Sequence, residues 1–312
     1  MKVISAAGKI RHACERRILT IGIFDGVHRG HIHLIQKVVK KARLRKGVSL
    51  VLTFYPHPYH VLKPRAYLPL LISLKHRTKL IESLGVDVCL LQQFTEHFSS
   101  MNASDFIEEI IAKKIKPEEI YVGSDFSFGK NKHGDIALLK HFAKKYSFKV
   151  TVVKPISVAG RIVSSTLIRK CIQQGDLQKA ELFLSRPVSL LGKVVGGNKR
   201  GRRLGFPTAN IDCGSEVVPP RGVYLVRIIV SNKTYYGIAN IGIRPSFRQK
   251  KPHVTTEVYI FNLKRNLYNA YIEIEFMKKI RNEKRFSSSA ALAKQIQKDE
   301  KVALALLRNS KL

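Results

Sequence analysis

The sequence predicts an α/β domain built on a doubly wound parallel sheet, followed by a small antiparallel β-barrel with a C-terminal helix. Up to about residue 185, short apolar runs such as "RRILTIGIF" and "VSLVLTF" alternate with helix-like segments. Strands that alternate with helices favour a parallel sheet covered on both faces. After residue 186 the apolar runs follow one another between Gly, Pro, Asn and charged turns, which is typical of antiparallel strands. We therefore expect two domains, residues 1–185 and 186–312.

The first domain is expected to contain strands joined by helices. The strands are predicted over 16–24, 48–54, 86–94, 118–123 and 148–153. After the first strand, apolar residues recur at helical spacing, namely Leu34, Ile35, Val38, Val39 and Ala42. Further helices are predicted over 74–85, 103–115, 137–146 and 164–175.

The second domain is expected to contain strands and one long helix. The strands are predicted over 188–195, 222–230, 233–242, 255–261 and 270–276. The final helix has a capping serine near Ser287 and an apolar side made by Leu292, Ile296, Ala303 and Leu306.

The cysteines and the apolar runs indicate the compartment. Cys14, Cys89, Cys171 and Cys213 are far apart and form no CxxC pair, which suits thiols in a reducing cytosol. No apolar run approaches the ~20 residues that a membrane helix needs, and no apolar stretch precedes the first charges. We expect a cytoplasmic protein with no membrane partner.

The net charge is strongly positive, at +34 from 56 Lys and Arg against 22 Asp and Glu. Such a charge attracts polyanions and phosphate-bearing small molecules. The lysines are spread along the polar sides of predicted helices, as in "KKAR" and "AKKIK", which favours a solvated surface over a dedicated nucleic-acid patch. A nucleic-acid partner is therefore not expected to be obligatory.

The segment "GIFDGVHRGH", residues 22–31, lies on the turn between the first strand and its helix. Ligands bind beyond the carboxyl ends of the strands in doubly wound sheets. Gly26 and Gly30 would let the backbone approach a phosphate, and His28 and His31 could donate hydrogen bonds to it. Zinc is disfavoured, since no nearby Cys or third His completes a ligand set. By itself, the motif leaves function and chance equally open.

Three further segments end strands or begin helices in the first domain. "VSSTLIR" (163–169) offers hydroxyls and a cation, although Ser164 and Thr166 could merely cap a helix. "VGSDFSFGKNKHGD" (122–135) is a glycine-rich loop with two aromatic rings, which could hold a planar ligand or pack in the core. "TFYPHP" (53–58) places an aromatic residue and a histidine at the end of a strand.

Together, these four segments resemble the nucleotidyltransferase half of the prokaryotic bifunctional riboflavin kinase/FAD synthetases. In the second domain, "GRRLGFPTANI", "RGVYLV", "NIGIRPSF", "TTEVYIF" and "RNEKRFSSSAALAKQIQKD" resemble the kinase half of the same family. The resemblance covers nearly the whole chain. It implies riboflavin, FMN and ATP as substrates, FAD as product, and Mg²⁺ as cofactor.

In the first domain the resemblance implies attack by the FMN phosphate on the α-phosphorus of ATP. Catalytic roles fall on His28, His31 and Arg169. ATP and its phosphates would be bound by Gly22, Phe24, Asp25, Gly26, Gly30, Ser164 and Thr166. The flavin would be bound by Phe54, His57, Gly123, Asp125, Phe126 and Phe128. Positioning and charge neutralisation can carry such a transfer.

In the second domain the resemblance implies attack by the riboflavin 5′-hydroxyl on the γ-phosphorus of ATP. Glu257 would be the base, although taken alone it looks like an exposed strand carboxylate. Thr208 and Asn210 would offer oxygens to Mg²⁺. Gly201, Gly205, Phe206 and Pro207 would shape the ATP loop, which lacks the GK[ST] ending of a Walker A sequence.

The kinase half departs from the family pattern at several positions. Ser246 replaces a usual threonine, and Asn269 replaces a glycine, which an asparagine can imitate because it tolerates a left-handed backbone. Two alternatives stay open: a single-activity FAD synthetase whose kinase half has decayed, and a basic nucleic-acid-binding protein on a nucleotide-binding fold. The oligomeric state, including a homo-oligomer, is also open.

Overall fold

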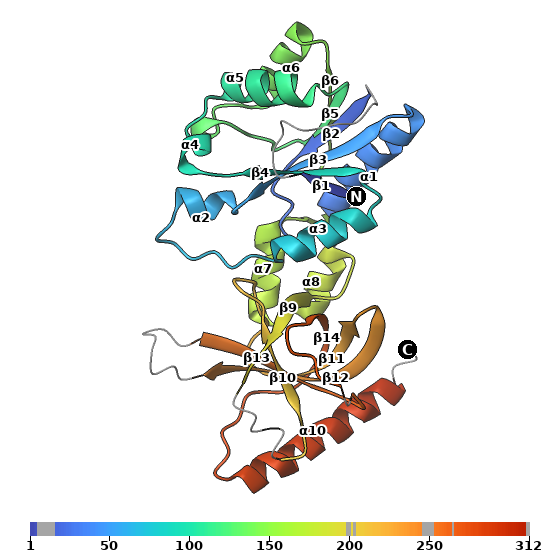
Figure 1. Cartoon of the computed structure of the whole chain (residues 1–312), viewed down its shortest axis with the longest axis vertical. Helices are drawn as coiled ribbons and strands as arrows, with labels where there is room; N and C mark the ends of the chain where they lie inside the picture. The colour runs from blue at the N-terminus through green and yellow to red at the C-terminus, as the bar shows by residue number, and fades with distance from the viewer. Residues whose placement is uncertain (5–15, 198–200, 202–203, 245–252, 264, 310–312) are drawn as a thin grey trace. The chain divides into compact units, whose positions relative to one another are not determined.

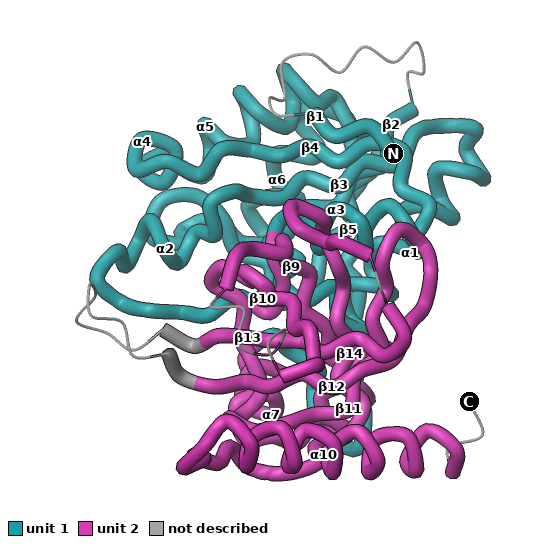
Figure 2. The backbone as a smooth tube through the Cα atoms, turned by 60° about the horizontal axis from the view of Figure 1, so that its bottom comes forward, with its two compact units in different colours: residues 1–70, 74–165 teal, residues 71–73, 166–312 magenta. Residues whose placement is uncertain are grey.

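The computed structural model describes residues 1–4, 16–197, 201, 204–244, 253–263 and 265–309. The chain forms two compact units, shown in two colours in Figure 2. The first unit contains residues 1–70 and 74–165, and the second contains 71–73 and 166–312. The domain boundary between residues 185 and 186 stays a prediction; the compact units change over earlier, at residue 165.

The first unit contains a six-stranded sheet whose strands are all parallel (Figure 1). Their order across the sheet is β1 (Lys2–Ile4), β4 (Val88–Gln93), β3 (Val48–Tyr55), β2 (Arg17–Ile21), β5 (Glu119–Gly123) and β6 (Lys149–Val153). The chain runs outward from β2 to β3 and β4, then returns to place β5 on the other side of β2. The carboxyl ends of β2 and β5 therefore flank the point where the strand order reverses, where this class of sheet binds ligands.

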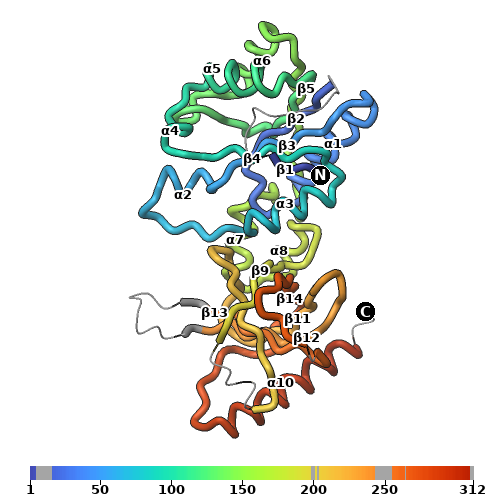
Figure 3. Tube along the Cα trace, in the orientation of Figure 1, coloured from blue at the N-terminus to red at the C-terminus, as the bar shows by residue number. Residues whose placement is uncertain are grey.

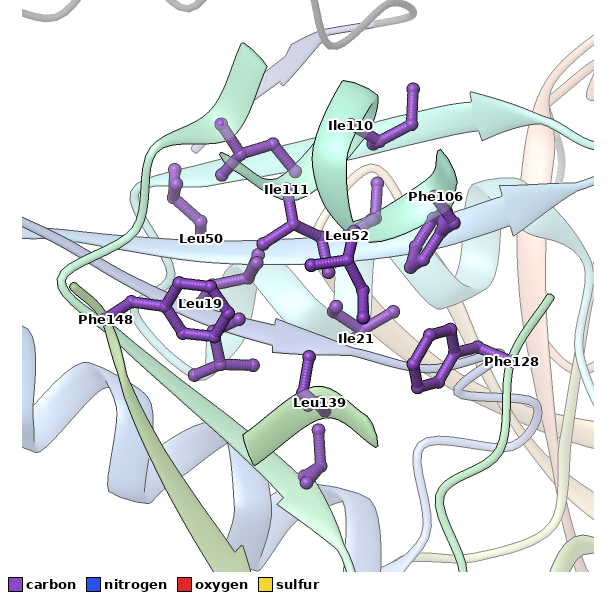
Figure 4. Close-up of a cluster of buried hydrophobic side chains, with 14 of the residues drawn as sticks. Leu19, Ile21, Leu50, Leu52, Phe106, Ile110, Ile111, Phe128, Leu139 and Phe148 are labelled. Atoms are coloured by element: carbon purple, nitrogen blue, oxygen red, sulfur yellow. The ribbon is translucent and has the colours of Figure 1, made fainter. Parts of the chain in front are cut away.

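Helices cover both faces of this sheet, which confirms the doubly wound prediction. On one face, the π-helix η2 (Phe106–Ile115) and α6 (Ile136–Lys145) pack on Leu19, Leu50 and Leu52 (Figure 4). The helix α1 (Arg29–Leu44) contacts β2, β3 and β5, and its buried residues lie outside that cluster. They are the five predicted ones, Leu34, Ile35, Val38, Val39 and Ala42. Burial of each Leu, Ile or Val side chain among them contributes roughly 1.5–3 kcal/mol to folding.

Short elements complete the first unit. They are α2 (Pro58–Leu62), α3 (Leu74–Ser83), α4 (Glu96–Ser99), α5 (Ala103–Asp105), η3 (Lys130–Lys132), β7 (Ser157–Val158) and β8 (Arg161–Ile162). The predicted helix over 103–115 is thus a short α-turn that continues as a π-helix. At its end the backbone N–H of Lys116 donates to the carbonyl of Ile111, five residues back (2.8 Å).

The second unit is a closed antiparallel barrel with helices, as predicted. The helices α7 (Ser165–Gln174) and α8 (Leu177–Leu184) precede it. The order around the barrel is β10 (Thr208–Asp212), β13 (His253–Ile260), β12 (Lys233–Arg244), β11 (Gly222–Val230), β14 (Tyr271–Arg281) and β9 (Ser189–Val195). Figure 3 follows the chain from yellow at β9 to red at the last helix, α10 (Ser289–Asn309).

The helix α10 packs on the outer face of the barrel. Ile296, Ala303 and Leu306 join a cluster with Val223 and Leu225 of β11. Ser288 caps the helix, since its hydroxyl accepts from the backbone N–H of Ala291 (3.1 Å). The predicted position of the cap, near Ser287, is confirmed to within one residue.

The second unit also includes the segment Leu71–Ser73, although the chain on both sides of it belongs to the first unit. The backbone N–H of Ser73 donates to a carboxylate oxygen of the buried Glu216 (2.6 Å).

Candidate active sites

The turn after β2 holds an unusual backbone. Phe24, Gly26 and Val27 all have positive φ angles, of 52°, 87° and 39°. A positive φ is costly for a residue with a side chain, and most of all for a β-branched one such as Val27. Phe24 is buried against Gly22, where a Cβ atom would lie 2.9 Å from the tip of the ring. The sequence uses glycine at position 22 to let this ring fold back onto the strand.

The two histidines of the turn stand side by side at the start of α1. His28 is the N-cap residue, and its Nδ1 accepts from the backbone N–H of His31 (3.4 Å). The two imidazole rings are stacked, with centroids 3.6 Å apart, and Phe24 packs edge-on against His31. A Cβ at Gly30 would lie 3.3 Å from the His28 ring, so this glycine makes room for the imidazole. The pair lies at the positive end of a helix, where anions are stabilised.

Three side chains from elsewhere in the fold hold this turn. The guanidinium of Arg77, on α3, donates to the carbonyl oxygens of Ile23 (2.5 Å) and Phe54 (3.1 Å). The hydroxyl of Thr53 also donates to the Ile23 carbonyl (3.1 Å). The hydroxyl of Ser165 donates to the carbonyl of Asp25 (2.8 Å). The sequence did not predict that these three side chains hold the turn, because each acts on backbone atoms far away along the chain.

The glycine-rich loop after β5 contains both a core residue and partly exposed residues. Phe128 is 9% exposed and packs beside Phe106 in the core (Figure 4), as the alternative reading of this segment anticipated. Phe126 stacks on Phe128 and is half-buried, while Asp125 is exposed. A Cβ at Gly123 would lie 3.0 Å from a carboxylate oxygen of the Asp125 side chain. Of the two rings, Phe126 is thus the one with surface left to offer a ligand.

The segment after β3 supplies a second aromatic face. Phe54 is half-buried at the end of the strand and packs edge-on against Phe94. His57 is the N-cap of α2, and its Nδ1 accepts from the backbone N–H of Tyr59 (3.1 Å). The imidazole of His57 therefore has a structural role in capping, beside any role in binding.

The segment 163–169 is divided between the two compact units. Ser164 is half-buried and belongs to the first unit with the histidines. Thr166 is exposed and Arg169 is buried, and both belong to the second unit. A role for Thr166 and Arg169 beside the histidines stays a prediction.

In the barrel, strand register brings the kinase candidates together. Asn210 of β10 lies directly opposite Glu257 of β13, and Glu257 lies opposite Asn240 of β12. Directly opposed residues of antiparallel strands point to the same face, with Cβ atoms about 5 Å apart. Thr208, two residues before Asn210, shares that face. The strand β10 was not predicted, and Asn240 had no predicted role.

Glycines and an aromatic ring border this face of the barrel. A Cβ at Gly197 would overlap the side-chain amide of Asn210. A Cβ at Gly201 would lie 3.1 Å from the Thr208 hydroxyl. Phe206 is buried, packs edge-on against Tyr259, and follows Gly205, whose φ is 85°. The backbone N–H of Phe206 donates to the carbonyl of Gly201 (2.8 Å), and Pro207 is exposed.

Comparison with known proteins covers both units. A family model described as FAD synthetase matches residues 10–167, and one described as riboflavin kinase matches residues 184–307. A bifunctional riboflavin kinase/FMN adenylyltransferase of Buchnera aphidicola from Schizaphis graminum is 38% identical over 96% of both chains. The chain belongs to this bifunctional family. The enzyme of that name from Bacillus subtilis is 36% identical and covers 96% of this chain and 95% of its own.

A solved structure has the family fold over almost its whole length. It is the crystal structure of a protein from Streptococcus pneumoniae described as a macrolide-efflux protein. It has a TM-score of 0.82 and 28% identity, and the match covers 97% of this chain and 99% of that one. The efflux activity that its name mentions refers to the Streptococcus pneumoniae protein. Among the residues described for this chain, no helix is long and apolar enough to cross a membrane.

The departures from the bifunctional family pattern can be compared with the structure. Asn269 has a φ of 66°, which confirms that it takes the left-handed conformation expected for the usual glycine. Ser246 lies outside the described residues. The family's kinase half thus keeps its turn at residue 269 in this chain.

The oxygen donors of the barrel face fit Mg²⁺. In the described part of the chain, no three His, Cys, Asp or Glu side chains are grouped to hold a metal. Thr208 and Asn210 offer neutral oxygens beside the Glu257 carboxylate. Mg²⁺ prefers oxygen, keeps several waters, and is usually held by few protein groups together with substrate phosphates.

Proposed function

We propose that this chain phosphorylates riboflavin to FMN and adenylylates FMN to FAD. The observation that carries the proposal is that the two family models match residues 10–167 and 184–307, and that a relative named for both activities matches 96% of the chain. The motif residues of each half support it, since paired imidazoles begin α1 and an asparagine faces a glutamate in the barrel.

In the adenylyltransferase reaction, a phosphate oxygen of FMN attacks the α-phosphorus of ATP. The new P–O bond forms as the bond to the β-phosphate oxygen breaks, and pyrophosphate leaves. His28 and His31 donate hydrogen bonds to the phosphate oxygens, whose charge rises in the transition state. Ser164, in the turn before α7, binds the same phosphates. Phe54 and Phe126 offer flat surfaces to the rings of the substrates.

In the kinase reaction, Glu257 accepts the proton of the riboflavin 5′-hydroxyl as the oxygen attacks the γ-phosphorus, and ADP leaves. Thr208 and Asn210 would hold Mg²⁺, which when bound neutralises phosphate charge. Gly201 and Phe206 are hydrogen-bonded to each other and lie close to these residues in the chain, and backbone groups of this segment bind the ATP phosphates.

The proposal includes a cytoplasmic location. Cys89 and Cys213 are present as thiols, and Cys89 is buried in the sheet. Burial raises the pKa of the Cys89 thiol to about 11, which keeps it protonated and unreactive. Thiols of this kind suit a reducing compartment.

Purified protein incubated with riboflavin, ATP and Mg²⁺ tests both activities at once. Separation of the flavins by chromatography over time should show FMN first and FAD later, with pyrophosphate released in step with FAD. Supply of FMN in place of riboflavin isolates the second reaction. FAD from FMN but none from riboflavin would identify a single-activity enzyme with a decayed kinase half. No product from either substrate would refute the proposed function.

A further inference from the structure

A buried arginine lies behind the histidine turn, on a helix that carries none of the predicted site residues. Arg77 is 5% exposed, and its two terminal nitrogens donate to the carbonyls of Ile23 and Phe54. These carbonyls lie at the ends of two neighbouring strands, β2 and β3. The planar guanidinium therefore ties the start of the histidine turn to the end of the next strand.

The charge of Arg77 is costly to bury and is balanced inside the unit. Burial lowers the pKa of the Arg77 guanidinium, and the negative charge of Asp25 offsets part of this effect. Arginine stays protonated even so, because its ordinary pKa is far above neutrality. Asp25 itself is 4% exposed and lies within the histidine turn. A buried carboxylate is itself costly without a nearby cation, so Arg77 and Asp25 offset part of each other's burial cost.

The turn needs support from outside because its own backbone is strained. Positive φ angles at Phe24 and Val27 persist only where surrounding structure enforces them. The carbonyl of Ile23 accepts from both Arg77 and Thr53, which fixes the residue that precedes the strained stretch. His28 follows directly after Val27, so the position of its ring depends on these bonds.

We propose that Arg77 is a positioning residue for adenylyl transfer, which holds the turn so that His28 and His31 face the reacting phosphates and which balances the charge of Asp25. This inference rests on the proposed function of the first unit. Arg77 touches backbone atoms of the turn and acts on the reaction through the histidines.

Two substitutions of Arg77 separate the effect of its hydrogen bonds from the effect of its charge. Arg77→Met removes both hydrogen bonds and the charge, whereas Arg77→Lys keeps a charge but loses the fixed fork that reaches two carbonyls. Lys40→Met is the matched control, because it removes the same charge from an exposed position on α1. Far-UV circular dichroism and thermal unfolding of each variant report on the folding of the first unit, and the riboflavin kinase activity of the same samples reports on the second unit.

We expect Arg77→Met to lower kcat for FAD synthesis from FMN by about 10²-fold, because a displacement of ~1 Å costs that much. KM for ATP should change much less, Arg77→Lys should fall between wild type and Arg77→Met, and Lys40→Met should match wild type. Kinase kcat should stay within about twofold in all three variants, since that site depends on barrel register.

The inference is overturned if either Arg77 variant keeps wild-type kcat, or if only KM for ATP rises. If Arg77→Met does not fold, Arg77→Lys decides the question by the same measures. The proposed function fails separately, when the wild-type protein makes no FAD from FMN. If the wild-type protein makes FAD from FMN and the Arg77 variants do so equally well, only the inference about Arg77 is refuted.

Discussion

The two candidate sites both handle ATP phosphates, but their residues are placed in different ways. In the first unit the histidines follow a strained turn at the end of a parallel strand, and hydrogen bonds from Arg77 and Thr53 hold that turn. In the barrel, Asn210 and Glu257 face each other because antiparallel register puts them there. A turn site depends on distant supports, whereas a register site depends on its immediate neighbours. Substitutions in each of the two sites can test this difference.

Loss of both histidines should have the largest effect. Removal of one preorganised donor costs ~10²-fold or more, so we expect His28→Ala/His31→Ala to lower kcat for FAD synthesis by about 10⁴-fold. Product analysis of riboflavin reactions should show FMN that accumulates without FAD. His28→Asn keeps an N-cap acceptor and controls for helix stability. FAD formation at a near wild-type rate in the double variant would rule out the phosphate role of the pair.

The equivalent change in the barrel is Glu257→Gln, which keeps size and removes the base. We expect kcat for FMN formation to fall by at least about 10²-fold. FAD synthesis from supplied FMN should stay at the wild-type rate, because its site is in the other unit. FMN formation from riboflavin and FAD formation from supplied FMN should be measured on the same sample and compared. An unchanged kinase kcat would return Glu257 to an ordinary strand carboxylate.

A smaller effect should come from the glycine that faces Asn210. Gly197→Ala would place a methyl group on the Asn210 amide and displace it, so we expect the kinase rate at limiting Mg²⁺ to fall about tenfold. Gly196→Ala is the matched control, since nothing lies within 4 Å of a Cβ there. Magnesium titrations of kinase activity compare the two. Equal curves for both variants would mean that Asn210 tolerates displacement.

The smallest effect concerns backbone strain in a turn of the barrel unit. Asn269 has a φ of 66°, and an alanine there costs about 1 kcal/mol of stability, whereas a glycine costs nothing in strain. Thermal unfolding should therefore place Asn269→Ala below wild type and Asn269→Gly level with it, with both activities unchanged. If Asn269→Ala unfolds at the same temperature as the wild type, the left-handed backbone at residue 269 does not strain an alanine.

The sequence predicts most of the fold because its apolar periodicities are strong. Five helix positions from Leu34 to Ala42 are the buried ones, and the barrel strands rich in Val, Ile and Tyr are found where expected. The strand β10 was missed because "TANID" is short, polar and follows a proline. Its pairing with β13 and β9 makes it a strand, and such pairing depends on distant residues.

The candidate sites were less accessible to sequence reasoning. Side chains in motifs could be identified, but the burial of Phe128 and the capping by His57 follow from packing and local backbone. Arg77 lies in "LKHRTKLIES", whose basic residues look like a solvated helix face. Which of these basic residues is buried depends on the tertiary fold, and the composition of the segment does not reveal it.

The short segment Leu71–Ser73 has a consequence for the inheritance of the two activities. Because it belongs to the barrel unit, the chain changes units before residue 71, after residue 73 and again at residue 165. A gene divided at the last of these points would leave the buried Glu216 without the N–H that Ser73 donates. The two halves are therefore not freely interchangeable. Recombination that exchanged one half would have to preserve residues 71–73 and the hydrogen bond from Ser73 to Glu216.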